Sequence, residues 1–176
     1  QLTENLPDDA PLMFLGRIEP IKGTHIAVQV ALKANRKLII AGNIPDDGIT
    51  YFETKIKPFL SDKIEYVGPV NDQQKNELLG KSLALLMPIC WNEPFGIVMA
   101  EAMACGTPVL GFGRGSVPEV VTNGVTGFIS SNTTEMTEHV RLCQSLDRRT
   151  IRQTAERRFS DDKISDDYLS LYQKMK

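Results

Sequence analysis

The sequence predicts an α/β domain with a doubly wound parallel sheet of about six strands and helices on both faces. Two observations predict this fold. Short apolar runs alternate along the chain with segments in which apolar residues recur at helical spacing. The apolar runs are also continuous, with no alternation of polar residues, which is typical of parallel strands covered on both faces.

The predicted strands are short, and the first four end in glycine or proline. They are residues 11–16, 37–42, 63–68 and 83–88, ending at Gly16, Gly42, Gly68 and Pro88, followed by 108–112 and a shorter strand at 127–130. Ligands of open parallel sheets bind outside the carboxyl ends of the strands. We therefore expect the chemistry at that edge.

Helices are predicted between these strands. They cover about 23–35, 49–60, 72–81 and 94–105, and further helical sequence follows the last strand to the end of the chain. Ile26, Val30 and Ala34 supply the helical spacing of the first. Asp72 is the predicted N-cap of the third, because a carboxylate can accept hydrogen bonds from the first amides of a helix.

The composition is that of an ordinary soluble globular protein. The 176 residues are 41% apolar and 24% charged, with a formal net charge of −2, which does not predict a nucleic-acid partner. Cys90, Cys105 and Cys143 form no CxxC pair, so we expect buried, reduced thiols in a cytoplasmic protein. The polar start at Gln1 indicates a piece of a longer protein, with residues 1–10 a linker remnant.

The loop after the first strand, GRIEPIKG, carries two cations beside glycines. Lys22 lies near a helix N-terminus, where the helix dipole disfavours a cation by a few tenths of a kcal/mol. An anion that binds Arg17 and Lys22 would explain this placement. The alternative, two solvated cations flanking a turn, stays open at this point.

The segment NEPFG indicates a second anion-binding element. Pro94 suits the first turn of a helix, and Gly96 allows a ligand to approach the backbone closely. The free N–H groups of Gly96, Ile97 and Val98 would then face the strand edge. Alternatively, Glu93 is only a favourable charge at the start of a helix.

Glu101 is the unusual residue of the strongly apolar fourth helix. An unpaired buried charge is costly, so a polar group or solvent must meet it. If both residues lie on one helix, Glu93 and Glu101 are about 12 Å apart along its axis. This exceeds the roughly 5–9.5 Å between the two carboxylates of a glycosidase. It suits the two ends of one elongated ligand with an anionic middle.

Together these motifs resemble a known family. Glu93-x7-Glu101 within EPFGIVMAEAMACGTPV, with GRIEPIKG before it and GSVPEVVTNGVTGFI after it, is similar to the donor-binding half of retaining GT-B glycosyltransferases of family 4, or group 1. The resemblance runs from about Leu12 to Ser130. It implies a Rossmann-like domain, one half of a GT-B fold.

The resemblance implies a role for each matching residue in binding a nucleotide-sugar (NDP-sugar). Arg17 and Lys22, next to Gly16, would grip the diphosphate, and Glu93 would bind hydroxyls of the transferred sugar. Glu93, Arg17 and Lys22 are thus the implied catalytic residues. Glu101 would bind the ribose. The amides of Phe95, Gly96, Ile97 and Val98 would bind phosphate and sugar, and the loop with Gly68 and Val70 would line the base pocket.

The resemblance also implies what surrounds the donor. No metal and no cofactor are expected, since no DxD triplet is present. Residues 1–176 would be the nucleotide-sugar-binding domain, with helix 160–176 crossing to a missing N-terminal domain that holds a sugar, lipid-linked or small-molecule acceptor. The fragment alone would be inactive, and the parent could contact the inner membrane surface peripherally. Open alternatives are a non-catalytic nucleotide-binding module and an NDP-sugar epimerase or hydrolase.

Other features have ordinary explanations beside functional ones. Trp91 either walls the sugar site or packs against the sheet edge. The arginine-rich tract from Arg141 to Lys163 favours a solvated helix face over a membrane-surface patch. His25 and His139 have no Cys, Asp or His at metal-ligand spacing. The loop GNIPDDG departs from the family's G-x-G-P, so no contact is assigned to residues 43–47.

Overall fold

The predicted parallel sheet is confirmed. The computed structural model describes residues 2–174, except for the side chains of 166–168, 170, 171 and 174. The strands are β1 (Leu12–Leu15), β2 (Leu38–Ala41), β3 (Ile64–Gly68), β4 (Ala84–Met87), β5 (Val109–Phe112) and β6 (Gly127–Ser130). Their order is β3-β2-β1-β4-β5-β6, and every neighbouring pair is parallel.

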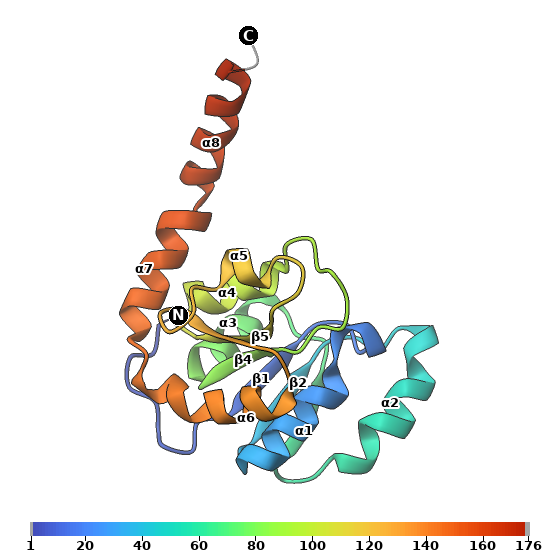
Figure 1. The fold of residues 1–176 in the computed structure, drawn as a ribbon. Helices are drawn as coiled ribbons and strands as arrows, with labels where there is room; N and C mark the ends of the chain where they lie inside the picture. The colour runs from blue at the N-terminus through green and yellow to red at the C-terminus, as the bar shows by residue number, and fades with distance from the viewer. Residues whose placement is uncertain (1, 175–176) are drawn as a thin grey trace.

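Helices cover both faces of the sheet, as Figure 1 shows. On one face lie α1 (Thr24–Ala34), α2 (Ile49–Lys55) and α6 (Thr133–Leu142). On the other lie α3 (Asp72–Lys81), α4 (Ile97–Ala104), α5 (Val117–Val120) and α7 (Arg148–Phe159). The last helix, α8 (Asp161–Lys174), projects away from this body. Short 3-10 turns lie at Pro20–Lys22, Asp46–Gly48, Lys57–Phe59 and Cys143–Ser145.

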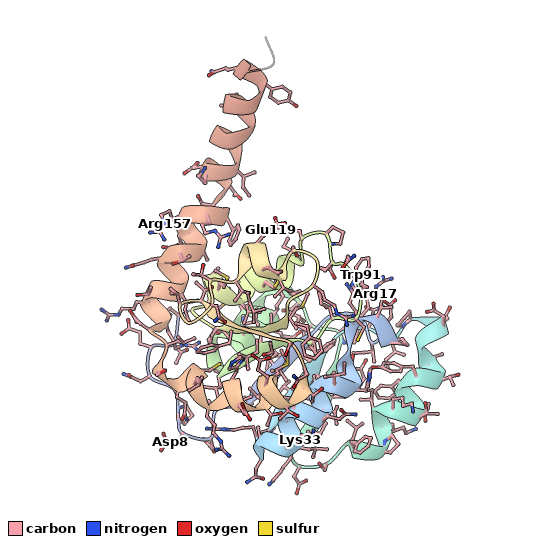
Figure 2. The ribbon with its side chains drawn as sticks, viewed as in Figure 1. Asp8, Arg17, Lys33, Trp91, Glu119 and Arg157 are labelled. Carbon is pink, nitrogen blue, oxygen red and sulfur yellow. The ribbon has the colours of Figure 1, made fainter. Side chains whose placement is uncertain are left out.

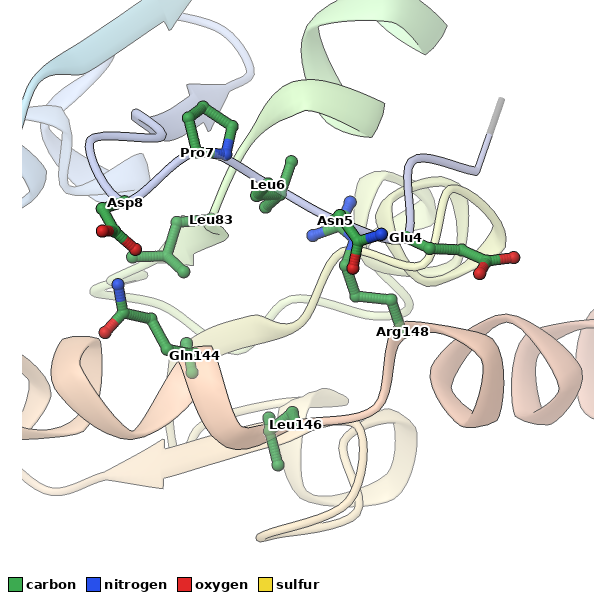
Figure 3. Close-up of a pocket in the computed structure, with 10 residues that line it drawn as sticks. Glu4, Asn5, Leu6, Pro7, Asp8, Leu83, Gln144, Leu146 and Arg148 are labelled. Atoms are coloured by element: carbon green, nitrogen blue, oxygen red, sulfur yellow. The ribbon is translucent and has the colours of Figure 1, made fainter.

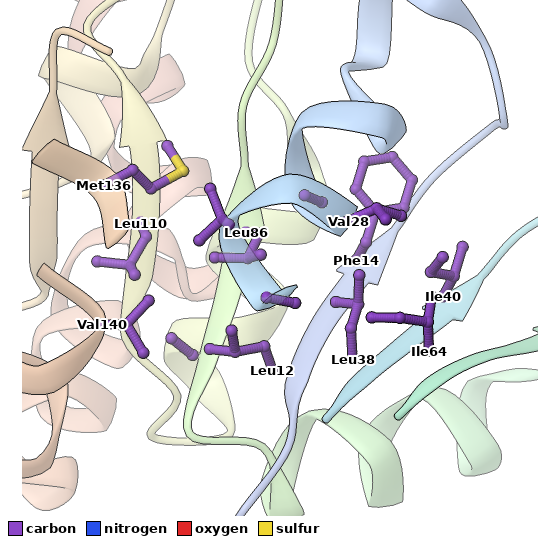
Figure 4. Packing of buried hydrophobic residues seen from close by; sticks show 14 of the residues in the cluster. Leu12, Phe14, Val28, Leu38, Ile40, Ile64, Leu86, Leu110, Met136 and Val140 are labelled. Carbon is purple, nitrogen blue, oxygen red and sulfur yellow. The ribbon is translucent and has the colours of Figure 1, made fainter. Parts of the chain in front are cut away.

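The continuous apolar runs are explained by two cores, one on each face of the sheet. Successive strand residues point to opposite faces. In β1, Leu12 and Phe14 therefore join the core under α1, whereas Met13 joins the core under α4. Figure 4 shows part of the first core, with Met136 and Val140 of α6 packed toward Leu110. Full burial of each such side chain contributes about 1.5–3 kcal/mol.

The chain reverses its winding direction between β1 and β4. Leu12 pairs with Ala84 and Met13 with Leu85, so these two strands are neighbours although β2 and β3 come between them in sequence. On either side of this central pair, the strand order continues to β3 at one edge of the sheet and to β6 at the other. Ligands of open α/β sheets bind at such a switch point. The loops after β1 and β4 meet there.

Glycine at position 23 brings these two loops together. Gly23 has φ 75°, and a Cβ atom there would lie 2.0 Å from the carbonyl oxygen of Pro88. Only glycine allows this approach, because real Cβ atoms do not come so near to a backbone oxygen. The N–H of Cys90 also donates to the carbonyl of Ile21 at 2.8 Å. The start of α1 is thus fixed against the end of β4.

Three predicted helix ends are wrong. The fourth helix begins at Ile97, not Pro94, because its N-cap Gly96 has a left-handed φ of 69°. The N-cap of α3 is Asn71, not Asp72; its side chain accepts from the amide of Gln74 at 2.9 Å in a capping box. The second helix ends at Lys55, followed by a 3-10 turn at Lys57–Phe59 in place of helix to residue 60.

The segment before β1 is held along the amino edge of the sheet. Arg148 donates to the carbonyl of Thr3 at 2.6 Å, and Arg149 pairs with Glu4 at 2.6 Å. Figure 3 shows this segment facing the junction of α6 and α7 across a cavity of about 330 Å³. The cavity lies at the edge opposite to the predicted site. Among the described residues, no helix combines the length and apolar composition that crossing a membrane requires.

Candidate functional site

A cavity of about 170 Å³ lies at the carboxyl ends of β1 and β4, at the switch point. It is lined by Phe14, Leu15, Gly16, Arg17, Lys22, Met87, Ile89, Glu93, Gly96, Ile97 and Val98. Figure 2 labels Arg17 and Trp91 at this end of the sheet. The structure therefore brings most of the predicted diphosphate and sugar residues to one cavity. Gly68, Val70, Phe95 and Glu101 do not line it.

Lys22, Glu93 and Trp91 form one cluster. The Lys22 Nζ lies 2.5 Å from Glu93 Oε2, and both side chains are largely buried. The indole N–H of Trp91 donates to the same oxygen at 3.1 Å, and Nζ of Lys22 lies 4.8 Å from the indole ring centroid. Trp91 thus acts through its N–H as well as its ring. The hydrogen bond from the indole was not expected from the sequence, whereas the expected packing is observed, because Trp91 also packs against the core under α4.

Arg17 also has a carboxylate partner. Its guanidinium lies 3.3 Å from Glu19 Oε1, and the Arg17 side chain stays 58% exposed. The other oxygen of Glu19 is buried, with no hydrogen-bond partner among the described residues. Glu19 was not predicted as part of the site, because a carboxylate between two cations has no distinctive spacing. Each loop cation thus faces an acidic side chain of the protein.

The start of α4 is open and its position is fixed. Gly96 offers no side-chain cap, so the first amides of the helix have no side-chain acceptor. The loop before it is held by Ser116, whose N–H donates to the Glu93 carbonyl at 2.9 Å and whose Oγ donates to the Phe95 carbonyl at 2.7 Å. A Cβ at Gly115 would lie 2.4 Å from the Glu93 nitrogen. The segment GFGRGS, residues 111–116, therefore ends in a turn that supports the loop carrying Glu93.

Two of the predicted residues outside the cavity lie in other surroundings. The Phe95 ring packs edge-on against Phe159 of α7, with centroids 5.9 Å apart, so only its backbone is near the site. Val70 packs against the core under α4, following Gly68 at the end of β3. These placements do not test the roles expected of the Phe95 amide and of the backbone at 68–70, which stay predictions.

Glu101 has a partner that the sequence did not indicate. The Lys75 ammonium of α3 donates to Glu101 Oε1 at 2.5 Å and pairs with Asp72 at 3.0 Å. The hydrogen bond to Glu101 raises the pKa of Lys75 above its usual value. The expectation that a polar group or solvent meets Glu101 is confirmed, although the sequence did not identify Lys75 as that group. The estimate of 12 Å loses its basis, because Glu93 lies in the loop before α4.

Several other charged and titratable groups have local partners. In the arginine-rich tract, Arg152 pairs with Glu156 at 2.7 Å on the solvated side of α7. Arg148 is buried and Arg158 donates to the Val120 carbonyl at 2.8 Å, so the predicted solvated helix face holds for only part of the tract.

Cys105 and Cys143 are buried as expected, whereas Cys90 is exposed. His25 hydrogen-bonds Tyr51 at 2.8 Å, and burial lowers the pKa of its ring. Among the described residues, no three acidic, cysteine or histidine side chains gather where they could hold a metal ion.

The chain is similar to known proteins over most of its length. The family described as "Glycosyl transferases group 1" matches residues 3–157. A D-inositol 3-phosphate glycosyltransferase of Mycolicibacterium smegmatis is 31% identical over 128 residues, covering 69% of this chain and 29% of its own length. One from Mycobacterium tuberculosis H37Ra is 27% identical over 181 residues, covering 95% and 38%. The chain spans only about a third of these relatives.

Solved structures share the fold. AviGT4, described as a glycosyltransferase involved in avilamycin A biosynthesis, superposes with a TM-score of 0.82 at 26% identity, covering 97% of this chain and 52% of its own. Anabaena Alr3699/HepE, solved with UDP, superposes with a TM-score of 0.82 at 22% identity, covering 95% and 49%. In each case this chain corresponds to about half of the neighbour.

Proposed function

The chain belongs to the group 1 glycosyl transferases and has the fold of one half of a GT-B enzyme, and from this we propose that it binds the nucleoside diphosphate sugar that the parent enzyme uses as donor. The observation that carries the proposal is the cavity at the β1/β4 switch point. Two cations and the uncapped start of a helix converge there, which is the chemistry that binds a diphosphate.

Each part of the donor has a matching group. In the proposed complex, Arg17, Lys22 and the first amides of α4 bind the diphosphate, and Glu93 binds hydroxyls of the sugar. As the bond between the sugar and the diphosphate breaks, negative charge grows on the leaving phosphate. The two loop cations, once drawn to the diphosphate, and the dipole of α4 stabilise that charge. Glu101 binds the ribose, and the backbone at 68–70 meets the base.

The finer features of the reaction rest on the resemblance of the Glu93–Glu101 segment. It supports a retaining outcome and a donor site that uses neither metal nor cofactor. Because the chain spans 29% to 38% of these curated relatives, we place the acceptor on a further part of the parent protein. A polyol phosphate, a sugar or a lipid-linked acceptor, the last with peripheral membrane contact, would suit that part.

Calorimetric titration with UDP-, GDP- and ADP-sugars tests the proposal and identifies the base. Binding of at least one donor is expected. Replacing Arg17 and Lys22 by alanine should weaken it by about 1.5–3 kcal/mol for each charge-assisted hydrogen bond lost. Lys33→Ala, in the last turn of α1 and exposed, is the control and should bind like the parent. Unchanged binding by both site variants would place the diphosphate elsewhere.

Incubation with the tightest donor also separates the alternatives. A non-catalytic nucleotide-binding module leaves the donor intact whatever acceptor is supplied. Release of free sugar would indicate a hydrolase, and a changed sugar configuration would indicate an epimerase. Transfer to an acceptor by the parent protein is the result that the proposed function requires.

A further inference from the structure

We infer that Lys75 is a positioning residue for the donor ribose: it holds Glu101 in place through one carboxylate oxygen and leaves the other oxygen to the ribose hydroxyls. The inference rests on the proposed function, in which Glu101 binds the ribose. Lys75 lies on α3 and Glu101 on α4, so the pair joins two helices on the same face of the sheet.

The two carboxylate oxygens of Glu101 have different surroundings. Lys75 Nζ donates to Oε1 of Glu101 at 2.5 Å, and among the described residues no donor reaches Oε2. The side chains of Lys75 and Glu101 are 22% and 28% exposed, so the pair is mostly covered but can still be reached by a ligand. A carboxylate held at one oxygen by a charge-assisted hydrogen bond loses rotational freedom. The other oxygen can then accept a hydrogen bond from a ribose hydroxyl.

The backbone on which Lys75 lies is fixed relative to α4. Two hydrogen bonds tie α3 to the end of α4 and the residues after it. Cys105 Sγ lies 2.9 Å from Asn76 Oδ1, and Thr107 Oγ1 donates to the Leu79 carbonyl at 2.6 Å. The capping box at Asn71 orders the first turn of α3. Lys75 therefore holds Glu101 from a rigid support.

A purely structural pair explains the arrangement less well. Ion pairs that remain partly exposed contribute little stability. The helix around Glu101 is otherwise apolar, and Met99, Ala102 and Met103 are buried. Lys75 also lines a different cavity from Arg17 and Lys22, one of about 270 Å³ between α3 and α4. Glu101, the proposed ribose contact, lines the same cavity as Lys75, so Lys75 acts on that contact and not on the diphosphate.

The test compares a nucleotide with and without ribose hydroxyls. UDP, GDP and ADP are titrated first, and the tightest is then compared with its 2′,3′-dideoxy analogue. Lys75→Met should weaken the ribonucleotide on the order of fivefold and change the dideoxy analogue less than about twofold. Lys75→Arg, which keeps a cation, should recover most of the affinity. Melting temperatures show whether each variant is folded.

Two further variants make the result specific. Asp72→Asn removes the other ion-pair partner of Lys75. The Asp72 side chain is 99% exposed, so this variant should bind the ribonucleotide like the parent. Lys75→Met combined with Glu101→Gln should be no weaker than Glu101→Gln alone, because Lys75 acts through Glu101.

Other outcomes overturn the inference. Equal losses for the ribonucleotide and the dideoxy analogue would mean that Lys75 contacts the base, the phosphates or only the fold. No loss, or tighter binding, would mean that Lys75 does not position Glu101 or competes with the ribose. If Glu101→Gln weakens the ribonucleotide and the dideoxy analogue equally, the proposed ribose contact itself is wrong. If no nucleotide binds to the parent, the whole donor proposal fails. Either result removes the basis for the role of Lys75.

Discussion

Glu93 and Glu101 each accept a hydrogen bond from a lysine at 2.5 Å, and the lysines come from separate elements. Lys22 lies in the loop after β1, whereas Lys75 lies on α3. The two carboxylates are therefore engaged before any ligand arrives. A ligand that binds beside them must compete with these lysines or share them. This changes what is expected from substitutions at both positions.

Glu93→Gln should tighten the binding of a nucleoside diphosphate that has no sugar. From the sequence alone, no effect is expected, because Glu93 faces the sugar. In the structure the diphosphate must draw Lys22 away from Glu93, so loss of the carboxylate frees the cation. We expect about threefold to tenfold tighter binding of the bare nucleotide by calorimetry. The added affinity given by the sugar should fall.

The double variant Lys22→Met with Glu93→Gln is the control for this effect. It removes the cation that Glu93→Gln sets free, so the gain should disappear. If the bare nucleotide binds more weakly to Glu93→Gln, Glu93 contacts the nucleotide directly and the competition between the two anions is not the reason.

Trp91→Phe should affect the sugar and spare the nucleotide. The substitution keeps an aromatic ring under Lys22 but removes the N–H that donates to Glu93 Oε2 at 3.1 Å. The sugar-dependent part of the donor affinity should fall by about 0.5–1.5 kcal/mol. Comparative titration of the bare nucleotide and its sugar conjugate measures this difference. A loss shared equally by both ligands would show that Trp91 only supports the fold.

Strands were easier to predict than helix ends and partners. Continuous apolar runs located every strand within about a residue, because burial on both faces is visible in local composition. The start of α4 was misplaced because Pro94 and the apolar residues after it suit a helix, and the left-handed turn at Gly96 has no comparable signal. The pairing of Lys75 with Glu101 depends on how two helices pack, which no local pattern records.

The turn before α5 should prove necessary for the loop that carries Glu93. Gly115 has φ 53°, and a Cβ there would lie 2.4 Å from the Glu93 nitrogen, so Gly115→Ala must displace that loop. Gly124→Ala is a matched control, because Gly124 has φ 76° with nothing within 4 Å of the added atom. Both variants bear backbone strain of about 1–2 kcal/mol.

Titration of both glycine variants with the donor measures the difference. Only Gly115→Ala should lose donor affinity, with the sugar conjugate affected more than the bare nucleotide. Similar losses in the two variants would mean that general destabilisation, and not the position of Glu93, sets the affinity.

Arg148 should be important for stability but not for the site. Its buried guanidinium donates to the carbonyls of Thr3, Ser82 and Gly80 and to Thr107 Oγ1. Burial lowers its pKa to about 10, so it remains charged near neutral pH. Arg148→Met leaves these acceptors unpaired and should cost roughly 3 kcal/mol or more.

Urea unfolding measures that cost, with Arg157→Met on the exposed side of α7 as the control. Donor binding by the folded fraction should be unchanged, because Arg148 lies at the amino edge of the sheet and the proposed site at the carboxyl edge. Loss of binding without loss of stability would contradict this separation.

The chain alone should bind donor without transferring sugar. Transfer needs both substrates held about 3–3.5 Å apart in a site that excludes water. The proposed cavity is open at the strand edge, and Ile97, 64% exposed, lies at its rim. On α8, the helix expected to cross to a further domain, Leu169 and Tyr172 are also exposed. The side chains of Tyr168 and Leu171 lie outside the described residues.

Incubation of the chain with its tightest donor and candidate acceptors, beside the parent protein, tests this prediction. Robust transfer by the chain alone would show that the acceptor site lies within these residues. Binding without transfer, with activity restored by the rest of the parent, would support an acceptor site on another domain.

The switch point also has a kinetic consequence. Its two strands meet through pairs such as Leu12 with Ala84, so the centre of the sheet closes only after the chain has formed the long connection through β2 and β3. Contacts between residues far apart in sequence slow folding, because loop entropy is lost before the contact is gained. The cavity lies at the carboxyl ends of these two strands, so during refolding ligand binding should return after the helices have formed. During synthesis, the site likewise cannot form before β4 has been translated.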